Sequence, residues 1–199
     1  MDLYICMLKV ITDKLITPMK FSMENIINLF AEKGSQMYGH EAVTQLEHAL
    51  QCATLASESG QSNEMITACL LHDLGHLIHS LGDDASSQGI DDLHEYRALP
   101  MLQKLFEPAV TEPIRLHVAA KRYLCAINID YWKKLSNASK TSLELQGGVF
   151  SLEVASGFIR QPYAECAVQL RMYDDQAKML NKSTPPLSYF TQYINACLK

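Results

Sequence analysis

The sequence lacks several features that would assign its function at once. It has no closely spaced cysteine pair, no internal repeat, no low-complexity tract and no apolar run long enough to span a membrane. Its six cysteines are scattered, which argues against a disulfide framework and indicates reduced core residues of a cytoplasmic protein. With a net charge of -5 and a pI near 5.8, it has no basic excess to suggest nucleic acid or an anionic membrane as partner.

The remaining composition is that of an ordinary soluble globular protein. The 199 residues are 48% hydrophobic and 20% charged, which fits one domain with a sizeable core. The first stretch is mildly apolar but is interrupted by Lys9, Asp13 and Lys14, so it resembles neither a signal peptide nor a membrane span. We therefore expect an N-terminal extension at 1–21 and a single domain at 22–199, with the oligomeric state left open.

Helical patterns dominate the chain, and alternating strand patterns are nearly absent. Apolar spacing and capping residues predict helices at 22–34, 44–60, 62–76, 93–106, 113–125, 139–145, 162–180 and after 186. A polar loop is expected at 82–92 and a turn at Gly147-Gly148. The predicted fold class is all-α, a single helical bundle.

The stretch LLHDLGH at 70–76 places a carboxylate and two imidazoles in an apolar helix. Burying the charge of Asp73 costs several kcal/mol unless it is paired or binds a metal. On a helix, His72 and Asp73 point about 100° apart, so both can face one cleft, and Asp73 could bridge two metals. Gly75 removes a side chain where a neighbouring helix must come close.

Four histidines fall on four separate predicted helices, namely His48, His72, His94 and His117. Their spacings of 24, 22 and 23 residues match one helix plus one connection, so each return of the chain can present an imidazole to a common centre. Imidazole and carboxylate ligands suit iron, manganese and zinc alike. The pattern predicts a metal site in the core of the bundle.

The order His48…His72-Asp73…Asp174 resembles the signature of the HD-domain superfamily, and the additional His94 and His117 imply two metals. Most members are phosphohydrolases, and a small branch consists of mixed-valent di-iron oxygenases. The resemblance is most specific to the organophosphonate-cleaving oxygenases of the PhnZ and TmpB type. Four stretches carry it: YGHE at 38–41, QLEH at 45–48, HVAAKRYL at 117–124 and LQGG at 145–148.

The resemblance implies a full set of site residues. One iron would take His48, His72, Asp73 and Asp174, and the second would take Asp73, His94 and His117. Tyr38 would coordinate the second iron at rest and leave when substrate arrives, with Glu41 as its partner on the same loop. The substrate pocket would be lined by His76, Lys121, Ser139, Ser142 and Arg171.

Helical spacing agrees with parts of this set. His117 and Lys121 are four residues apart and share a helix face, and Arg171 lies three residues before Asp174. Arginine suits a bidentate grip on phosphonate oxygens. Ser139 and Ser142 fall near the expected start of a short helix, where backbone N–H groups favour an anion.

The activity implied is dioxygen-dependent cleavage of the C–P bond of a 1-hydroxyalkylphosphonate, giving phosphate and a carboxylic acid. The substrate would be a small molecule such as 2-amino-1-hydroxyethylphosphonate or its trimethylammonium analogue, and the cofactor two iron ions in the mixed-valent Fe(II)/Fe(III) state. Two alternatives stay open. The same cage with a harder metal could activate water as a phosphohydrolase, or it could survive in a non-catalytic binding module.

Overall fold

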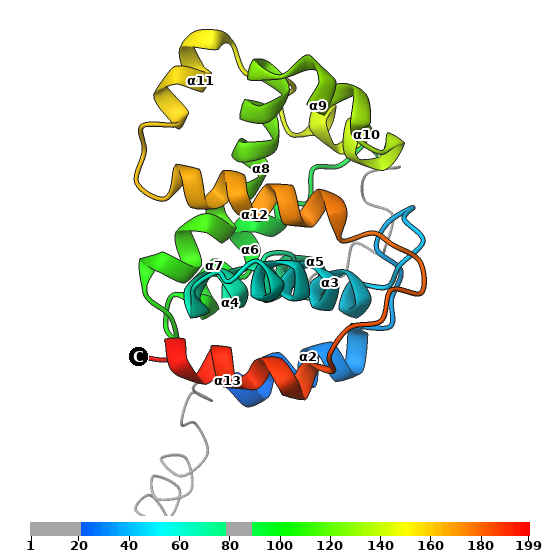
Figure 1. The fold of residues 1–199 in the computed structure, drawn as a ribbon, viewed down its shortest axis with the longest axis vertical. Helices are drawn as coiled ribbons and strands as arrows, with labels where there is room; N and C mark the ends of the chain where they lie inside the picture. Colours follow the sequence, from blue (N-terminus) through cyan, green and yellow to red (C-terminus); the bar gives the residue numbers. More distant parts are fainter. Residues whose placement is uncertain (1–20, 79–88) are drawn as a thin grey trace, which may run out of the picture.

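The computed structural model describes residues 21–78 and 89–199, and this part of the chain is built from helices and turns (Figure 1). Two isolated β-bridges, Met37 with Thr44 and Phe106 with Leu198, are its only extended pairings. The all-α prediction is confirmed. Nearly all of the expected N-terminal extension and most of the expected 82–92 loop lie outside the described residues.

Twelve helices are found in the described residues. They are α2 (Met23–Lys33), α3 (Gln45–Glu58), α4 (Asn63–Leu71), α5 (Leu74–Ile78), α6 (His94–Arg97), α7 (Leu99–Leu102), α8 (Pro108–Ile127), α9 (Ile129–Lys134), α10 (Asn137–Leu145), α11 (Leu152–Phe158), α12 (Ala164–Gln176) and α13 (Leu187–Cys197).

Local capping explains where the first helices begin. The side chain of Thr44 accepts a hydrogen bond from the backbone N–H of Glu47, and the Glu47 carboxylate accepts one from the backbone N–H of Thr44. This capping box satisfies two of the donors that a helix start leaves open. Ser62 caps α4 in a similar way, through the backbone N–H of Met65. The predicted starts of α3 and α4 are confirmed.

Helix boundaries elsewhere differ from the prediction. The LLHDLGH stretch does not lie on one continuous helix, because α4 ends at Leu71 and α5 begins at Leu74. The expected 93–106 helix is split into α6 and α7, since Pro100 has no N–H to donate to the carbonyl of Tyr96. The helix expected from Pro113 begins five residues earlier, at Pro108, and keeps Pro113 in its interior.

Three further differences involve the second half of the chain. The helix expected at 162–180 is shorter at both ends, as α12. Helices α9 and α11 were not predicted. Helix α9 buries none of its side chains, and the short α11 buries Ala155 and Phe158 but exposes the apolar Leu152 and Val154, so neither segment has a clear amphipathic pattern in the sequence.

The core lies between layers of helices. Helices α3 and α4 run through the middle of the molecule, with α13 and α2 on one side and α12 and α8 on the other (Figure 1). Buried residues of α2, α4 and α13, such as Phe30, Leu70 and Phe190, form the main apolar cluster. A second cluster joins α8, α11 and α12 through Leu116, Phe158 and similar residues. The elements that carry the four histidines are therefore packed around one interior region.

The close approach expected at Gly75 is confirmed. A Cβ atom added there would lie 2.0 Å from the carbonyl oxygen of His94 and 2.8 Å from its Cα. Only glycine lets α5 touch the backbone of α6 at this point. The contact brings the LLHDLGH stretch against the histidine of α6.

The cysteines and the possibility of a membrane-spanning helix can be assessed for the described residues alone. Their five cysteines, Cys52, Cys69, Cys125, Cys166 and Cys197, are free thiols. None of the helices in the described part combines the length and the hydropathy that a membrane crossing requires.

Candidate metal centre and substrate pocket

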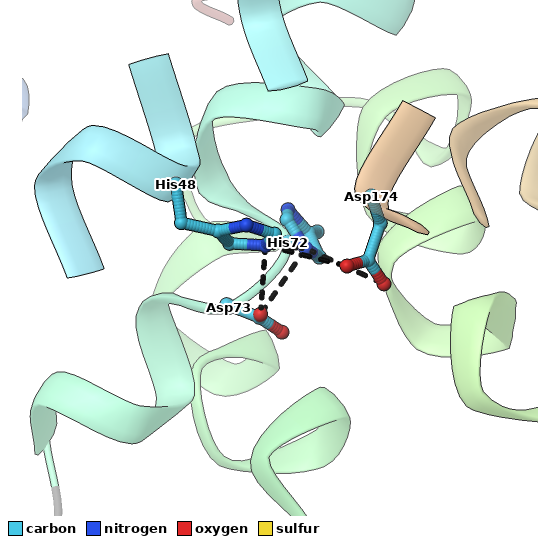
Figure 2. A group of neighbouring side chains, drawn as sticks. All are labelled: His48, His72, Asp73 and Asp174. Carbon is cyan, nitrogen blue, oxygen red and sulfur yellow. Dashed lines mark hydrogen bonds and ion pairs between the residues drawn. The ribbon is translucent and has the colours of Figure 1, made fainter. Parts of the chain in front are cut away.

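Six buried side chains from five parts of the fold meet in the interior. Their ligand atoms form two overlapping groups, each within 4.8 Å: His48, His72, Asp73 and Asp174 in the first, and Asp73, His94 and His117 in the second. We call these the first and second clusters. Figure 2 shows the first cluster, with the imidazoles of α3 and α4 and the carboxylate of α12 converging beside Asp73. The residues that the sequence grouped are thus brought together.

Asp73 is shared between the two clusters. Its Oδ2 lies 3.4 Å from Nε2 of His48 and 3.2 Å from Nε2 of His72. Its Oδ1 lies 3.4 Å from Nε2 of His94 and 3.5 Å from Nε2 of His117. One oxygen faces each histidine pair, which is the arrangement that a bridging carboxylate needs.

The hydrogen bonds of the histidines fix which ring nitrogen faces the centre. Nδ1 of His48, His72 and His117 donates to the backbone carbonyls of Ala177, Cys69 and Ile114, at 2.9, 2.9 and 2.7 Å. Because a carbonyl only accepts, Nδ1 carries the proton and Nε2 of the neutral ring keeps its lone pair. These lone pairs point into the clusters, and metal-binding histidines commonly donate their other ring N–H to a carbonyl or carboxylate in this way.

The imidazole lone pairs and the carboxylates lie close together, and cations between them would offset their mutual repulsion. Nε2 of His48 lies 3.2 Å from Nε2 of His72, and Nε2 of His94 lies 3.1 Å from that of His117. Within the described residues, no oxygen of Asp73 or Asp174 has a well-aligned hydrogen-bond donor, although Asp174 forms an ion pair. Two buried carboxylates and four imidazole lone pairs fit first-row metal ions in their chemistry and grouping.

The electrostatics keep the carboxylates ionised and one imidazole neutral. Burial acts to raise the pKa of Asp73, but the surrounding imidazoles, with His72 foremost, hold it well below its usual value. Burial, reinforced by the neighbouring His76, lowers the pKa of His94 to about 4. Carboxylate and neutral imidazole are the protonation states that bind metal.

Asp92 contacts two histidines of the site, and the sequence analysis did not single it out. Its Oδ1 accepts a hydrogen bond from Nδ1 of His94 at 2.8 Å, and its Oδ2 lies 2.6 Å from Nδ1 of His76. Asp92 closes a polar loop, and nothing in that pattern separates it from Asp91 next to it. Its position two residues before His94 is the one available signal.

The loop that carries Tyr38 lies against the first cluster. The Tyr38 ring stacks on the ring of His48, with centroids 3.9 Å apart and planes 11° apart. Burial and the negative charges of Asp174 and Asp73 raise the pKa of Tyr38 well above its usual value. The hydroxyl therefore keeps its proton in this arrangement.

Glu41, on the same loop, is bound to the opposite wall. Its carboxylate accepts hydrogen bonds from Oγ of Ser136 at 2.6 Å and from Nζ of Lys178 at 3.1 Å. The same Nζ reaches Oγ of Ser139 at 3.0 Å. Ser136 and Lys178 were not predicted, because a helix cap and a lysine among polar residues have no distinctive sequence pattern.

A pocket with a cavity volume of about 130 Å³ adjoins the second cluster. Its walls include every residue that the resemblance assigned to gating and substrate binding: Tyr38, Glu41, His76, Lys121, Ser139, Ser142 and Arg171. Nζ of the buried Lys121 donates to Oγ of Ser142 at 2.8 Å. Burial, together with the positive charge of Arg171, lowers the pKa of Lys121 to about 7.

Arg171 is more constrained than the sequence suggested. Its Nη1 lies 2.7 Å from Oδ2 of Asp174, and its Nη2 and Nε pair with Asp175. Its Nε also lies 3.2 Å from the hydroxyl of Tyr131. The guanidinium is thus anchored by carboxylates while it lines the pocket, and Asp175 serves as an anchor outside both clusters.

The two serines of the pocket differ in their helical positions. Helix α10 begins at Asn137, with Ser136 as its cap, so Ser139 lies in the first turn and its backbone N–H is bound to the Ser136 hydroxyl. Ser142 lies one turn further on, which corrects the expectation that both occupy the helix start. Ser142 contributes its hydroxyl, which accepts from Nζ of Lys121 and donates to the backbone carbonyl of Ser139 at 3.1 Å.

The fold and the His/Asp set define an HD-domain protein, and the HD domain model matches residues 46–144. The chain is 43% identical over 176 residues to hydroxymethylphosphonate dioxygenase of Gimesia maris, covering 88% of this chain and 87% of that protein. It is 37% identical over 172 residues to [1-hydroxy-2-(trimethylamino)ethyl]phosphonate dioxygenase (glycine-betaine-forming) of Leisingera caerulea, covering 86% and 88%. An uncharacterized protein of Acanthamoeba polyphaga mimivirus is 40% identical over 172 residues, covering 85% and 78%. The chain belongs to the family of organophosphonate-cleaving HD-domain oxygenases.

Proposed function

We propose that this protein is an oxygenase that uses dioxygen to cleave the C–P bond of a 1-hydroxyalkylphosphonate, releasing phosphate and a carboxylic acid. Two relatives that match most of the chain are dioxygenases of such phosphonates, by name. The single observation that carries the proposal is the carboxylate of Asp73, which presents one oxygen to each of two histidine pairs. Such a shared ligand is suited to two metals side by side.

The donor set fits two metal ions, and the family resemblance implies that they are iron in the mixed-valent state. The first cluster would hold one ion through two imidazoles and two carboxylates, and the second cluster the other through Asp73, His94 and His117. Three protein ligands leave room at the second metal for substrate and dioxygen. When bound, the iron pair supplies the activation of dioxygen and the redox chemistry at carbon.

The pocket residues supply binding and orientation. Lys121, Ser139 and Ser142 surround the space beside the second cluster and present an ammonium and two hydroxyls to a phosphonate. Arg171, anchored by its two aspartates, adds a fixed positive charge at the same wall. These groups place the carbon next to the phosphonate against the second cluster.

Tyr38 is positioned to shield the metals between turnovers. It lines the pocket and covers one face of His48, so a substrate that displaces it also opens the approach to the centre. A tyrosine that leaves only when substrate binds keeps dioxygen away from the reactive metal while the pocket is empty.

The phosphohydrolase alternative predicts different chemistry from the same cage. The deciding experiment measures phosphate release from hydroxymethylphosphonate, from 2-amino-1-hydroxyethylphosphonate and from a panel of phosphate esters, using iron-loaded protein with and without dioxygen. We expect release from a hydroxyphosphonate that requires dioxygen and consumes one equivalent for each phosphate. Release from esters alone, at the same rate without dioxygen, would overturn the proposal.

A further inference from the structure

The side chain of Asp92 joins the second cluster to the substrate pocket. It is 7% exposed, and its two oxygens are directed to two different imidazoles. Oδ1 accepts from Nδ1 of His94, a proposed metal ligand, at 2.8 Å, and Oδ2 lies 2.6 Å from Nδ1 of His76, a pocket residue. One carboxylate therefore orients a ring on each side of the boundary between cluster and pocket.

The backbone around Asp92 is built to hold this carboxylate still. Leu93 has a φ of 51°, a left-handed conformation that few non-glycine residues adopt, and this turn folds Asp92 back over the start of α6. The backbone N–H of His94 donates to Oδ1 of Asp92 at 3.3 Å, and Nε of Arg97 donates to the Asp92 carbonyl. Both the side chain and the main chain of Asp92 are thus tied to α6.

The two imidazoles that Asp92 binds are also in direct contact. The rings of His76 and His94 stack with centroids 4.0 Å apart and planes 24° apart. Gly75 allows this stacking, because it brings α5 against the backbone of His94. The stacked rings therefore bring the second cluster and the pocket into contact beside Asp92.

We infer that Asp92 is a positioning residue that assembles the second metal cluster and the substrate-binding histidine as one unit. By accepting from Nδ1 of His94, it keeps the proton on that nitrogen and turns Nε2 towards Asp73. By holding Nδ1 of His76, it aims the opposite edge of that ring into the pocket. Only this second role rests on the proposed function.

The test compares Asp92→Asn with Asp91→Asn by metal titration. An asparagine keeps the shape of the side chain but carries no charge, so an amide oxygen turned to Nδ1 of His94 holds that ring more weakly than the carboxylate does, and the NH₂ group cannot accept from His76. We expect Fe(II) or Mn(II) to bind to the first cluster as in the wild type and to the second cluster 10- to 100-fold more weakly, the usual effect of removing a ligand's outer partner.

Asp91 provides the matched control. It is the adjacent carboxylate, and its Oδ1 accepts from the backbone N–H of Leu93 at 3.2 Å rather than from an imidazole. Asp91→Asn should bind two metals with wild-type affinity. Asp92→Glu keeps a carboxylate one methylene further out and should recover part of the affinity, which separates positioning from general packing.

A third variant separates the two roles of Asp92. His76→Gln leaves the Asp92–His94 contact in place, so we expect both metals to bind normally while KM for the phosphonate rises. Wild-type binding of both metals by Asp92→Asn would overturn the inference, as would equal weakening of both clusters. Because metal affinity is measured without substrate, these outcomes do not depend on whether the proposed reaction is correct.

Discussion

The ring of Tyr38 lies nearly flat on the ring of His48, with an interplanar angle of 11° and a centroid distance of 3.9 Å. Nζ of Lys178 lies 5.5 Å from the centroid of the Tyr38 ring, within the range of a cation–π contact. The aromatic ring of Tyr38 is thus held by contacts with His48 and Lys178 that do not involve its hydroxyl. Packing and gating by this residue can be separated by changing one atom.

The variant Tyr38→Phe keeps the stacked ring and removes the hydroxyl. If the hydroxyl guards the metal centre, dioxygen consumption without substrate should rise severalfold, and less phosphate should form per dioxygen consumed. An oxygen electrode and a phosphate assay measure both quantities. Tyr189→Phe, on the exposed face of α13, is the control. Wild-type coupling in the Tyr38→Phe protein would contradict the guarding role of the hydroxyl.

The variant Asp73→Ala should lose both metals. The carboxylate faces both histidine pairs, so its removal takes a ligand from each cluster at once. Metal analysis should fall from two equivalents to fewer than one. Asp130→Asn, which alters a carboxylate in an exposed pair with Lys133, should keep two. Retention of two equivalents by Asp73→Ala would contradict the shared role.

The variant Gly75→Ala should damage both folding and the second cluster. Its Cβ would meet the His94 carbonyl oxygen at 2.0 Å, so α5 and α6 must separate. Overpacking of this kind costs about 1–3 kcal/mol. Gly157→Ala is the matched control, because a Cβ in α11 meets no atom within 4 Å and alanine favours a helix by about 0.5–1 kcal/mol. Thermal unfolding with metal analysis checks both; a Gly75→Ala protein as stable as the wild type would contradict the contact.

Phosphonate binding should weaken as the pH rises through about 7. Burial and the positive charge of Arg171, with a smaller effect of Lys178, lower the pKa of Lys121 to about 7. The negative charges of Asp174 and Asp175 act in the opposite direction and offset only part of this shift. Below that pH the ammonium is charged and attracts the phosphonate; above it the neutral amine does not. KM should therefore increase up to tenfold per pH unit above 7, although the phosphonate itself becomes more negative.

The variant Lys121→Arg tests the cause of that pH dependence. Arginine keeps its charge throughout this range, so KM should become nearly independent of pH. Profiles of KM between pH 6 and 9, with metal content checked at each end, give the comparison. An equal rise of KM in both proteins would assign the dependence to another group.

The histidine spacing predicted a metal site in the bundle core, and the family resemblance supplied Asp174 and the division into two clusters. His48, His72, His94 and His117 recur at the length of one helix plus its connection, and the fold brings them together wherever their helices begin and end. The break between α4 and α5 was not predicted, yet it left His72 and Asp73 facing the same interior. The convergence of the ligand side chains was thus easier to predict than the ends of the helices that carry them.

The residues that support the clusters were harder to predict. Asp92 lies in a loop rich in aspartate and serine, where a carboxylate that binds two imidazoles has the same sequence pattern as a solvated one. Lys178 follows the end of α12 and meets Glu41 and Ser139 from distant parts of the chain. Such partners are set by tertiary proximity, which local spacing does not encode.

The shared carboxylate of Asp73 also bears on how the chain keeps its fold. The first cluster contains His48 of α3 and Asp174 of α12, so an ion bound there would connect an early helix of the domain to a late one. Binding to the folded form alone adds about 2.7 kcal/mol at a metal concentration 100 times Kd. It also relieves the repulsion between Asp73 and Asp174. We therefore expect the midpoint of thermal unfolding to rise with the concentration of free metal.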